Sequence, residues 1–119
     1  YISLNNGTNN YDVRIYFDLN GDISVLSKVA GTTQVYLQSN SYTQTDFNKI
    51  AFKYKENDFA FWINGVEVAI DTSGITSPPN TLNKLDFKGN NFEFFGNTKG
   101  LQVFDKALSD YQLKQLTTI

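Results

Sequence analysis

Residues 47–66 read Phe47-Asn48-Lys49-Ile50-Ala51-Phe52-Lys53-Tyr54-Lys55-Glu56-Asn57-Asp58-Phe59-Ala60-Phe61-Trp62-Ile63-Asn64-Gly65-Val66, and this stretch decides the fold. Apolar and polar side chains alternate on both sides of Glu56-Asn57, as expected of two strands that each bury one face. Asn64-Gly65 follows, and an Asn-Gly pair between apolar runs is the strongest short-range signal for a tight hairpin. The stretch therefore predicts three antiparallel strands, over residues 47–55, 59–63 and 66–70.

The same alternation continues toward the N-terminus. In residues 11–18 one face carries Tyr11, Val13, Ile15 and Phe17, and the opposite face carries Asp12, Arg14, Tyr16 and Asp18. Asn20-Gly21 offers the two positive φ angles of a type I′ turn, which predicts a hairpin into the next strand. Gly31-Thr32 predicts a second tight connection. The strands expected in this half of the chain are residues 1–4, 11–18, 23–30 and 33–39.

The C-terminal part begins with a long loop over 71–81, because its pair of adjacent prolines cannot lie in a central strand. Three further strands are expected over residues 82–87, 92–95 and 100–104. A short helix over 110–117 has complete start signals: Ser109 is an N-cap, and Gln112 three residues later completes a capping box. Many short strands with frequent turns, closed by one short helix, predict an all-β, two-sheet antiparallel sandwich.

Composition restricts the function more than it reveals it. With 119 residues the chain forms a single domain, residues 1–119, and its lack of methionine indicates a fragment of a longer protein. Cysteine and histidine are absent, which excludes thiolate and imidazole chemistry, including Ser-His-Asp catalysis. A net charge of −2 argues against a nucleic-acid partner, which requires a basic surface. No run approaches the roughly 20 apolar residues of a membrane span, so we expect no membrane insertion.

Three stretches, taken in order, carry a family resemblance. Residues 47–54 resemble a "W-x-x-V-A-x-x-Y" strand, with Phe47 in place of tryptophan, and residues 59–66 resemble "L-x-L-Y-V-N-G-x". The third stretch, Leu101-Gln102-Val103-Phe104-Asp105-Lys106-Ala107-Leu108-Ser109-Asp110 with Leu113, is similar to "I-x-x-V-R-I-Y-N-R-A-L-S-D-x-E-I-x-x-L". Together they resemble the laminin-G-like or pentraxin-like branch of the concanavalin A-like lectin/glucanase superfamily. The chain is also similar to C-terminal lectin-like domains of bacteriophage structural and tail-fibre proteins.

The resemblance implies a concanavalin A-like jelly-roll of two antiparallel sheets, a fold that usually has further strands before the position of Tyr1. A neighbouring segment or another copy of the chain would then supply the missing edge. Relatives in this branch often bind Ca²⁺ through loop carboxylates and carbonyls. By resemblance alone Ca²⁺ is a candidate ligand, to which Asp71 or Asp86 would contribute, and the residue spacing itself indicates no metal site. No other cofactor is expected.

Carboxylates are too scattered for glycoside hydrolysis. Retaining glucanases place two carboxylates about 5 Å apart, whereas Glu56, Glu67 and Glu93 are isolated in the sequence. The sequence therefore predicts no catalytic residue and no enzyme. Residues 18–22 resemble a calcium loop, but Ile23 replaces the glycine that must follow the third ligand. A hairpin turn is the better interpretation.

A candidate binding surface lies on the strand faces that point away from the predicted core. Aromatic rings stack on the C–H faces of sugars while nearby amide and guanidinium groups bond to hydroxyls. The predicted carbohydrate-binding residues with this outward parity are Arg14, Tyr16, Gln34, Tyr36, Gln38 and Trp62. Lys28 and Lys53 share the parity. Two alternatives stay open: an ordinary solvated face, or a Trp62 that packs beneath a loop or a partner subunit.

The sequence thus favours a non-catalytic carbohydrate or cell-surface recognition module of a phage tail, fibre or other particle-surface protein. Such a lectin-like domain would lie on a virion or extracellular surface. Its expected partners are a cell-surface glycan or other copies of the chain, as in a homo-oligomer. The alternative is a purely structural or oligomerising domain that decorates a larger assembly without a ligand.

Overall fold

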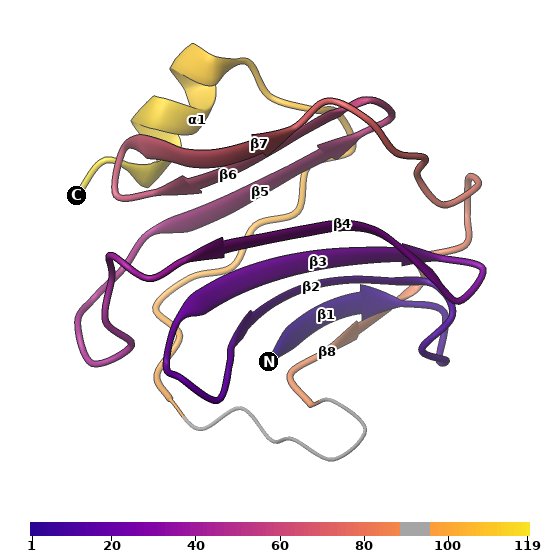
Figure 1. Ribbon diagram of the computed structural model, residues 1–119, viewed down its shortest axis with the longest axis horizontal. Helices are drawn as coiled ribbons and strands as arrows, with labels where there is room; N and C mark the ends of the chain where they lie inside the picture. The colour runs from indigo at the N-terminus through magenta and orange to yellow at the C-terminus, as the bar shows by residue number, and fades with distance from the viewer. Residues whose placement is uncertain (89–95) are drawn as a thin grey trace.

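The computed structural model describes residues 1–88 and 96–119, which form two antiparallel sheets and one helix (Figure 1). The larger sheet has the order β4-β3-β2-β1-β8, made of β1 (Ile2–Asn5), β2 (Asp12–Phe17), β3 (Ile23–Val29), β4 (Thr32–Ser39) and β8 (Lys84–Asp86). The smaller sheet has the order β5-β6-β7, made of β5 (Ile50–Lys55), β6 (Asp58–Ile63) and β7 (Val66–Asp71). The helix α1 (Asp110–Thr117) follows. The expected all-β, two-sheet antiparallel sandwich with a short C-terminal helix is confirmed.

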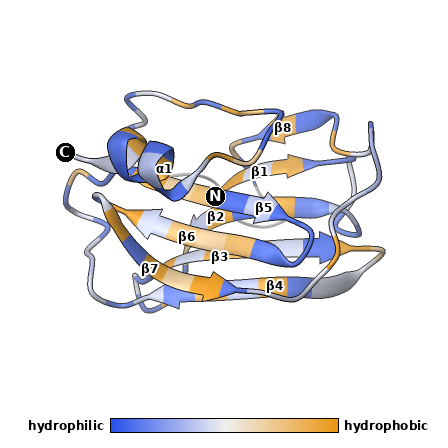
Figure 2. Cartoon of the chain, turned by 90° about the horizontal axis from the view of Figure 1, so that it is seen from above, coloured by the Kyte–Doolittle hydropathy of each residue, from blue (hydrophilic) through white to orange (hydrophobic). Residues whose placement is uncertain are grey.

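The two sheets pack face to face but differ in width. Seen from above, β5, β6 and β7 lie over β2, β3 and β4, and β7 contacts β4 (Figure 2). The strands β1 and β8 extend beyond this overlap (Figure 2). The wider sheet therefore has a margin that no strand of the described residues covers.

The core lies where the sheets overlap. Ile23 and Val25 of β3 face Phe61 and Ile63 of β6, and all four side chains are fully buried. Partly buried apolar side chains from both sheets surround them: Ile15, Phe17, Leu37, Tyr42, Ile50, Phe52, Val68 and Ala69. Burial of each large apolar side chain stabilises the fold by about 1.5–3 kcal/mol, so these four residues hold the two sheets together.

Two of the hairpins turn through positive φ angles, as the sequence predicts. Asn64 and Gly65 have φ of 51° and 83°, which is the type I′ pattern between β6 and β7. The second tight connection lies one residue earlier than predicted, at Ala30 (φ 49°) and Gly31 (φ 81°). Alanine tolerates this conformation poorly, which explains why the sequence pattern pointed to the following pair.

The predicted type I′ turn at Asn20-Gly21 is wrong. Only Gly21 has a positive φ, of 83°, in the connection between β2 and β3. The Asp18 carboxylate accepts hydrogen bonds from the backbone N–H groups of Asn20 (2.8 Å) and Asp22 (3.1 Å). These two hydrogen bonds from the following backbone to the Asp18 side chain form an Asx turn, which takes the place of the predicted type I′ turn.

Other strand predictions need correction in the C-terminal half. The strand expected over 82–87 is reduced to β8, and the strand expected over 92–95 lies outside the described residues. The run 100–104 is not a strand, because the described residues pair no sheet edge with it and a strand needs such a partner for its N–H and C=O groups. Its apolar residues instead line the opening between the two sheets, and Val103 is 56% exposed.

The helix α1 begins as predicted. The Ser109 hydroxyl accepts a hydrogen bond from the Gln112 backbone N–H (3.3 Å), and Gln112 Oε1 accepts one from the Ser109 N–H (2.9 Å). Leu113 is buried against Ala60 and Trp62 of β6. Leu113 therefore attaches α1 to the outer face of the three-stranded sheet. Among the described residues, no helix is long and apolar enough to cross a membrane.

A polar contact that the sequence does not reveal fixes the other end of α1. The buried Thr117 hydroxyl accepts a hydrogen bond from the Gly65 N–H (3.1 Å) and donates one to the Leu113 carbonyl (2.8 Å). The Lys49 ammonium donates to the Thr118 carbonyl at 3.0 Å. The helix end thus contacts the turn between β6 and β7.

Replacing the N-cap should destabilise the domain measurably. We expect Ser109→Ala to lower the free energy of unfolding by about 1 kcal/mol, because the Gln112 backbone N–H loses the hydroxyl oxygen that accepts its hydrogen bond. Urea denaturation followed by tryptophan fluorescence measures this change. Ser41→Ala, in an exposed loop, is the matched control and should leave the unfolding midpoint unchanged; an equal loss in both variants would contradict the capping role.

Candidate functional site

Four of the predicted binding residues lie together on the outer face of the five-stranded sheet. Cross-strand pairing aligns Arg14 of β2 with Tyr36 of β4 through β3, and the next row aligns Tyr16 with Gln38. Residues directly opposite each other, and residues two apart in a strand, share a face. The intervening Ile15 packs against the core, so all four point outward. Tyr36 is 48% exposed, and Gln38 is also exposed.

Tyr1 joins this cluster, which the sequence did not predict. Its ring lies edge-on to that of Tyr16, with centroids 6.1 Å apart and an interplanar angle of 60°. The Arg14 guanidinium carbon lies 4.7 Å from the centre of the Tyr1 ring. We call the set Tyr1, Arg14, Tyr16, Tyr36 and Gln38 the aromatic surface. Tyr1 was missed because residues 1–4 form too short a stretch for the alternation of apolar and polar side chains to assign Tyr1 to a face.

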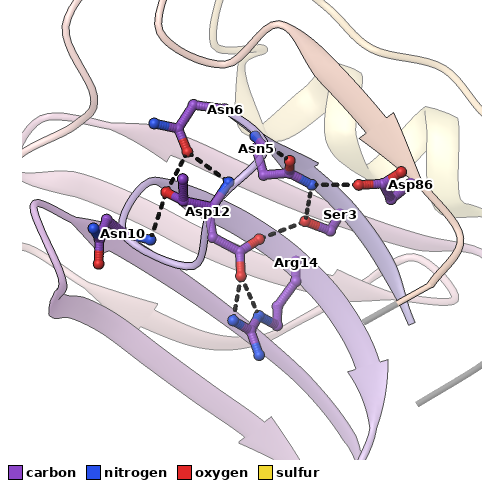
Figure 3. A network of polar contacts seen from close by, with 9 residues as sticks. Ser3, Asn5, Asn6, Asn10, Asp12, Arg14 and Asp86 are labelled. Carbon is purple, nitrogen blue, oxygen red and sulfur yellow. Dashed lines mark hydrogen bonds and ion pairs between the residues drawn. The ribbon is translucent and has the colours of Figure 1, made fainter. Parts of the chain in front are cut away.

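A buried polar network fixes Arg14 (Figure 3). Arg14 Nε donates to Asp12 Oδ2 at 2.6 Å, and a second guanidinium nitrogen forms an ion pair with the same oxygen. Ser3 Oγ donates to Asp12 Oδ1 at 2.5 Å, and Asn5 Nδ2 donates to both Ser3 Oγ and Asp86 Oδ2 at 3.0 Å. The network therefore ties β1, β2 and β8 together beside the aromatic surface.

The other end of the aromatic surface is acidic. Gln38 Nε2 donates to Asp18 Oδ2 at 2.5 Å and to Asp22 Oδ2 at 3.2 Å. Both carboxylates belong to the turn between β2 and β3. Burial raises the pKa of the Tyr16 phenol, and the neighbouring Tyr36 and Asp18 side chains raise this pKa further while Arg14 lowers it. Tyr16 therefore stays a neutral hydroxyl, able to donate and accept hydrogen bonds at neutral pH.

Trp62 does not belong to this cluster. It lies on β6, in the other sheet, and is 7% exposed beneath α1, where it packs with Ala60 and Leu113. Gln34 is turned aside as well, because its side-chain oxygen accepts a hydrogen bond from the Ile75 N–H (3.2 Å). Outward parity alone could not separate the two sheets, which explains why the sequence placed Trp62 with the tyrosines.

The lysines with outward parity also separate. Lys53 pairs with Asp58 at 2.6 Å on the three-stranded sheet, far in the topology from the aromatic surface. Lys28 lies on β3 directly opposite Asp12, so it is on the same face as Arg14. Of the two, only Lys28 contributes charge next to the aromatic surface.

The two aspartates implied by resemblance in calcium binding are not brought together. Asp71 ends β7 and accepts hydrogen bonds from the Ser73 N–H (3.0 Å) and hydroxyl (3.3 Å). Asp86 lies in the other sheet, bonded to Asn5 and 3.6 Å from the Lys84 ammonium. Within residues 1–88 and 96–119, no group of three or more acidic side chains is placed to hold a metal ion. Asp71 and Asp86 therefore lie in different sheets, and Ca²⁺ binding through either of them stays a prediction of the family resemblance.

A wide opening separates the two sheets beside β5. Its volume is about 1050 Å³. Apolar side chains line it from the uncovered margin, from β5 and from the segment before α1, among them Ile2, Leu4, Phe52, Leu101, Phe104 and Leu108. The opening lies within the sandwich. Arg14 and Tyr16 of β2 also border it, although they belong to the outer face of the wider sheet.

Comparison with known proteins supports the fold. No family model matches the chain, and no curated protein matches it. The chain is similar to a crystal structure of an S-layer domain-containing protein (residues 221–444) from Clostridium thermocellum, with a TM-score of 0.50 and 20% sequence identity. The similarity covers 98% of this chain and 60% of that structure. At this identity the likeness concerns the fold alone, and the superfamily resemblance of the sequence stays a prediction.

Removing Arg14 should destabilise the domain strongly. We expect Arg14→Met to lower the free energy of unfolding by about 3 kcal/mol, because it leaves the Asp12 carboxylate buried without its counter-charge. The side chains of Arg14 and Asp12 are 14% and 3% exposed. Chemical denaturation measures the loss.

Lys84→Met provides the matched control for this prediction. Its side chain is 57% exposed and its ammonium lies 3.6 Å from Asp86, so the cost should stay below about 1 kcal/mol. A similar loss of unfolding free energy in Arg14→Met and Lys84→Met would contradict the prediction, because the buried Asp12–Arg14 pair would then stabilise the domain no more than an exposed pair does.

Proposed function

We propose that this domain is a non-catalytic carbohydrate or cell-surface recognition module, and that the aromatic surface binds the ligand. The observation that carries the proposal is the convergence of Tyr1, Tyr16 and Tyr36 with an amide and a guanidinium on one exposed sheet face. Rings of this kind stack on sugar C–H groups while the polar groups bond to hydroxyls.

The rigidity of the aromatic surface supports the proposed binding function as much as its residue types do. Arg14 is held by Asp12 and lies over Tyr1, and Tyr1 contacts Tyr16. Side chains already ordered before binding lose little entropy when a ligand arrives. The aromatic surface therefore has the preorganised character of a recognition site, because Arg14, Tyr1 and Tyr16 already contact one another before a ligand binds.

A surface setting agrees with the structural comparison. The similar protein from Clostridium thermocellum is described as S-layer domain-containing, and a likeness of fold to such a protein supports a role on a cell or particle surface. A phage tail or fibre is the particular setting suggested by the sequence resemblance. The domain would then act extracellularly or on a virion, and the scattered glutamates support a role without catalysis.

One observation favours a second candidate function, that of a structural or oligomerising domain. The apolar opening between the sheets leaves residues such as Leu101 and Phe104 partly exposed, at 40% and 45%. Exposed apolar patches of this kind often mark protein contacts. Sedimentation velocity over a range of concentrations tests this candidate, which requires a homo-oligomer or a mixed assembly, whereas the first candidate binds glycans as a monomer too.

Binding should depend on Tyr36. We expect Tyr36→Ala to weaken glycan binding about twofold to twelvefold, because one aromatic stacking contact is worth about 0.5–1.5 kcal/mol. A glycan array followed by titration calorimetry on the strongest glycan measures the change. Circular dichroism confirms that the exposed substitution leaves the fold intact.

Trp62→Phe is the control that separates the two sheets. It reduces packing beneath α1 and should lower thermal stability while leaving glycan affinity unchanged. A loss of affinity in Trp62→Phe together with unchanged affinity in Tyr36→Ala would place the binding site on the three-stranded sheet and overturn the assignment to the aromatic surface.

A further inference from the structure

The charges around the aromatic surface are not arranged to receive an anion. Arg14 is the cationic side chain within this surface, beside the Tyr1 amino group, and it is already neutralised by the buried Asp12 carboxylate. Its side chain is only 14% exposed, and one side of the guanidinium faces the Tyr1 ring. A ligand carboxylate or sulfate would have to compete with Asp12 for the same donors.

The opposite end of the aromatic surface carries two carboxylates. Asp18 and Asp22 bond to the uncharged amide of Gln38, and the ion pairs found among the described residues include neither of them. The negative charges therefore stay uncompensated beside Tyr16 and Tyr36. Lys28, at the Asp12 end, is separated from this acidic end by the rows of Arg14 and Tyr16 in the sheet.

A ligand lying across both tyrosines must approach these carboxylates. Carboxylate oxygens accept strong hydrogen bonds from hydroxyl groups, and they repel anionic groups at close range even in water. Resting on the proposed function, we propose that the aromatic surface selects neutral, hydroxyl-rich glycans and discriminates against uronic-acid, sialylated and sulfated ones.

Matched polysaccharides test the selectivity directly. Polygalacturonate and hyaluronan, each beside its carboxyl-reduced neutral form, together with dextran, mannan, laminarin and chitin oligosaccharides, are immobilised and titrated with the full chain. We expect the neutral forms to bind at least about tenfold more tightly than their anionic parents. Neutral binding should change less than about twofold between 50 and 500 mM NaCl, since no ligand charge is screened.

Charge variants isolate the cause. Asp18→Asn combined with Asp22→Asn should raise the ratio of anionic to neutral affinity about fourfold, or about twofold for each charge at roughly 8 Å in water. Asparagine at position 18 can keep the Asx turn through its one oxygen, and its NH2 group can donate to Gln38 Oε1 when the Gln38 amide is flipped. Glu56→Gln combined with Glu67→Gln removes the same net charge from exposed positions on the other sheet and should leave this ratio unchanged.

The outcomes separate the selectivity from the binding function. Tight binding of an anionic polysaccharide that weakens steeply with salt overturns the selectivity and leaves the proposed recognition function intact. An equal effect of the two double variants also overturns it, because net charge rather than the aromatic surface would then control the ratio. Failure of every glycan to bind the folded protein overturns both proposals.

Discussion

The unequal width of the two sheets is the constraint on which the rest of the structure depends. Three strands can bury the inner face of only three others, and the side chains of Ile23, Val25, Phe61 and Ile63 mark where this happens. Stability therefore concentrates in the overlap of β5–β7 with β2–β4. The margin of β1 and β8 is held by other means, chiefly the polar network of Ser3, Asn5 and Asp12.

Because apolar packing holds the overlap and polar contacts hold the margin, a rigid polar network lies close to the aromatic surface. Buried polar groups are costly unless each is paired, and around Asp12 the pairs extend from β2 through β1 to β8. The same carboxylate that joins the margin to the sheet also orients Arg14. Local stability and the shape of the aromatic surface therefore depend on one buried residue.

Much of this architecture could be predicted from the sequence because the determining signals are local. Period-2 alternation located β2 and β6, and Ser109 with Gln112 located the start of α1. The prediction of a strand over 100–104 was wrong, because the apolar character of these residues does not show whether a sheet edge lies within reach. At the candidate site, parity found Arg14, Tyr16, Tyr36 and Gln38 correctly as one face. Parity could not show that Trp62 lies in the other sheet, because this depends on how distant strands pair. Nor could it show that α1 covers Trp62 there.

The pairing of β1 with β8 joins Ser3 to Asp86, residues more than 80 positions apart in the chain, whereas every other pairing among the described strands links neighbours in sequence. Closing so long a loop is slow compared with forming a hairpin. On a ribosome, β2–β4 and then β5–β7 can assemble as they emerge, while β1 waits with an unsatisfied edge until β8 is synthesised. Completion of the wider sheet is thus a late event in the synthesis of residues 1–119, and β1 is among the last of the described strands to acquire both neighbours.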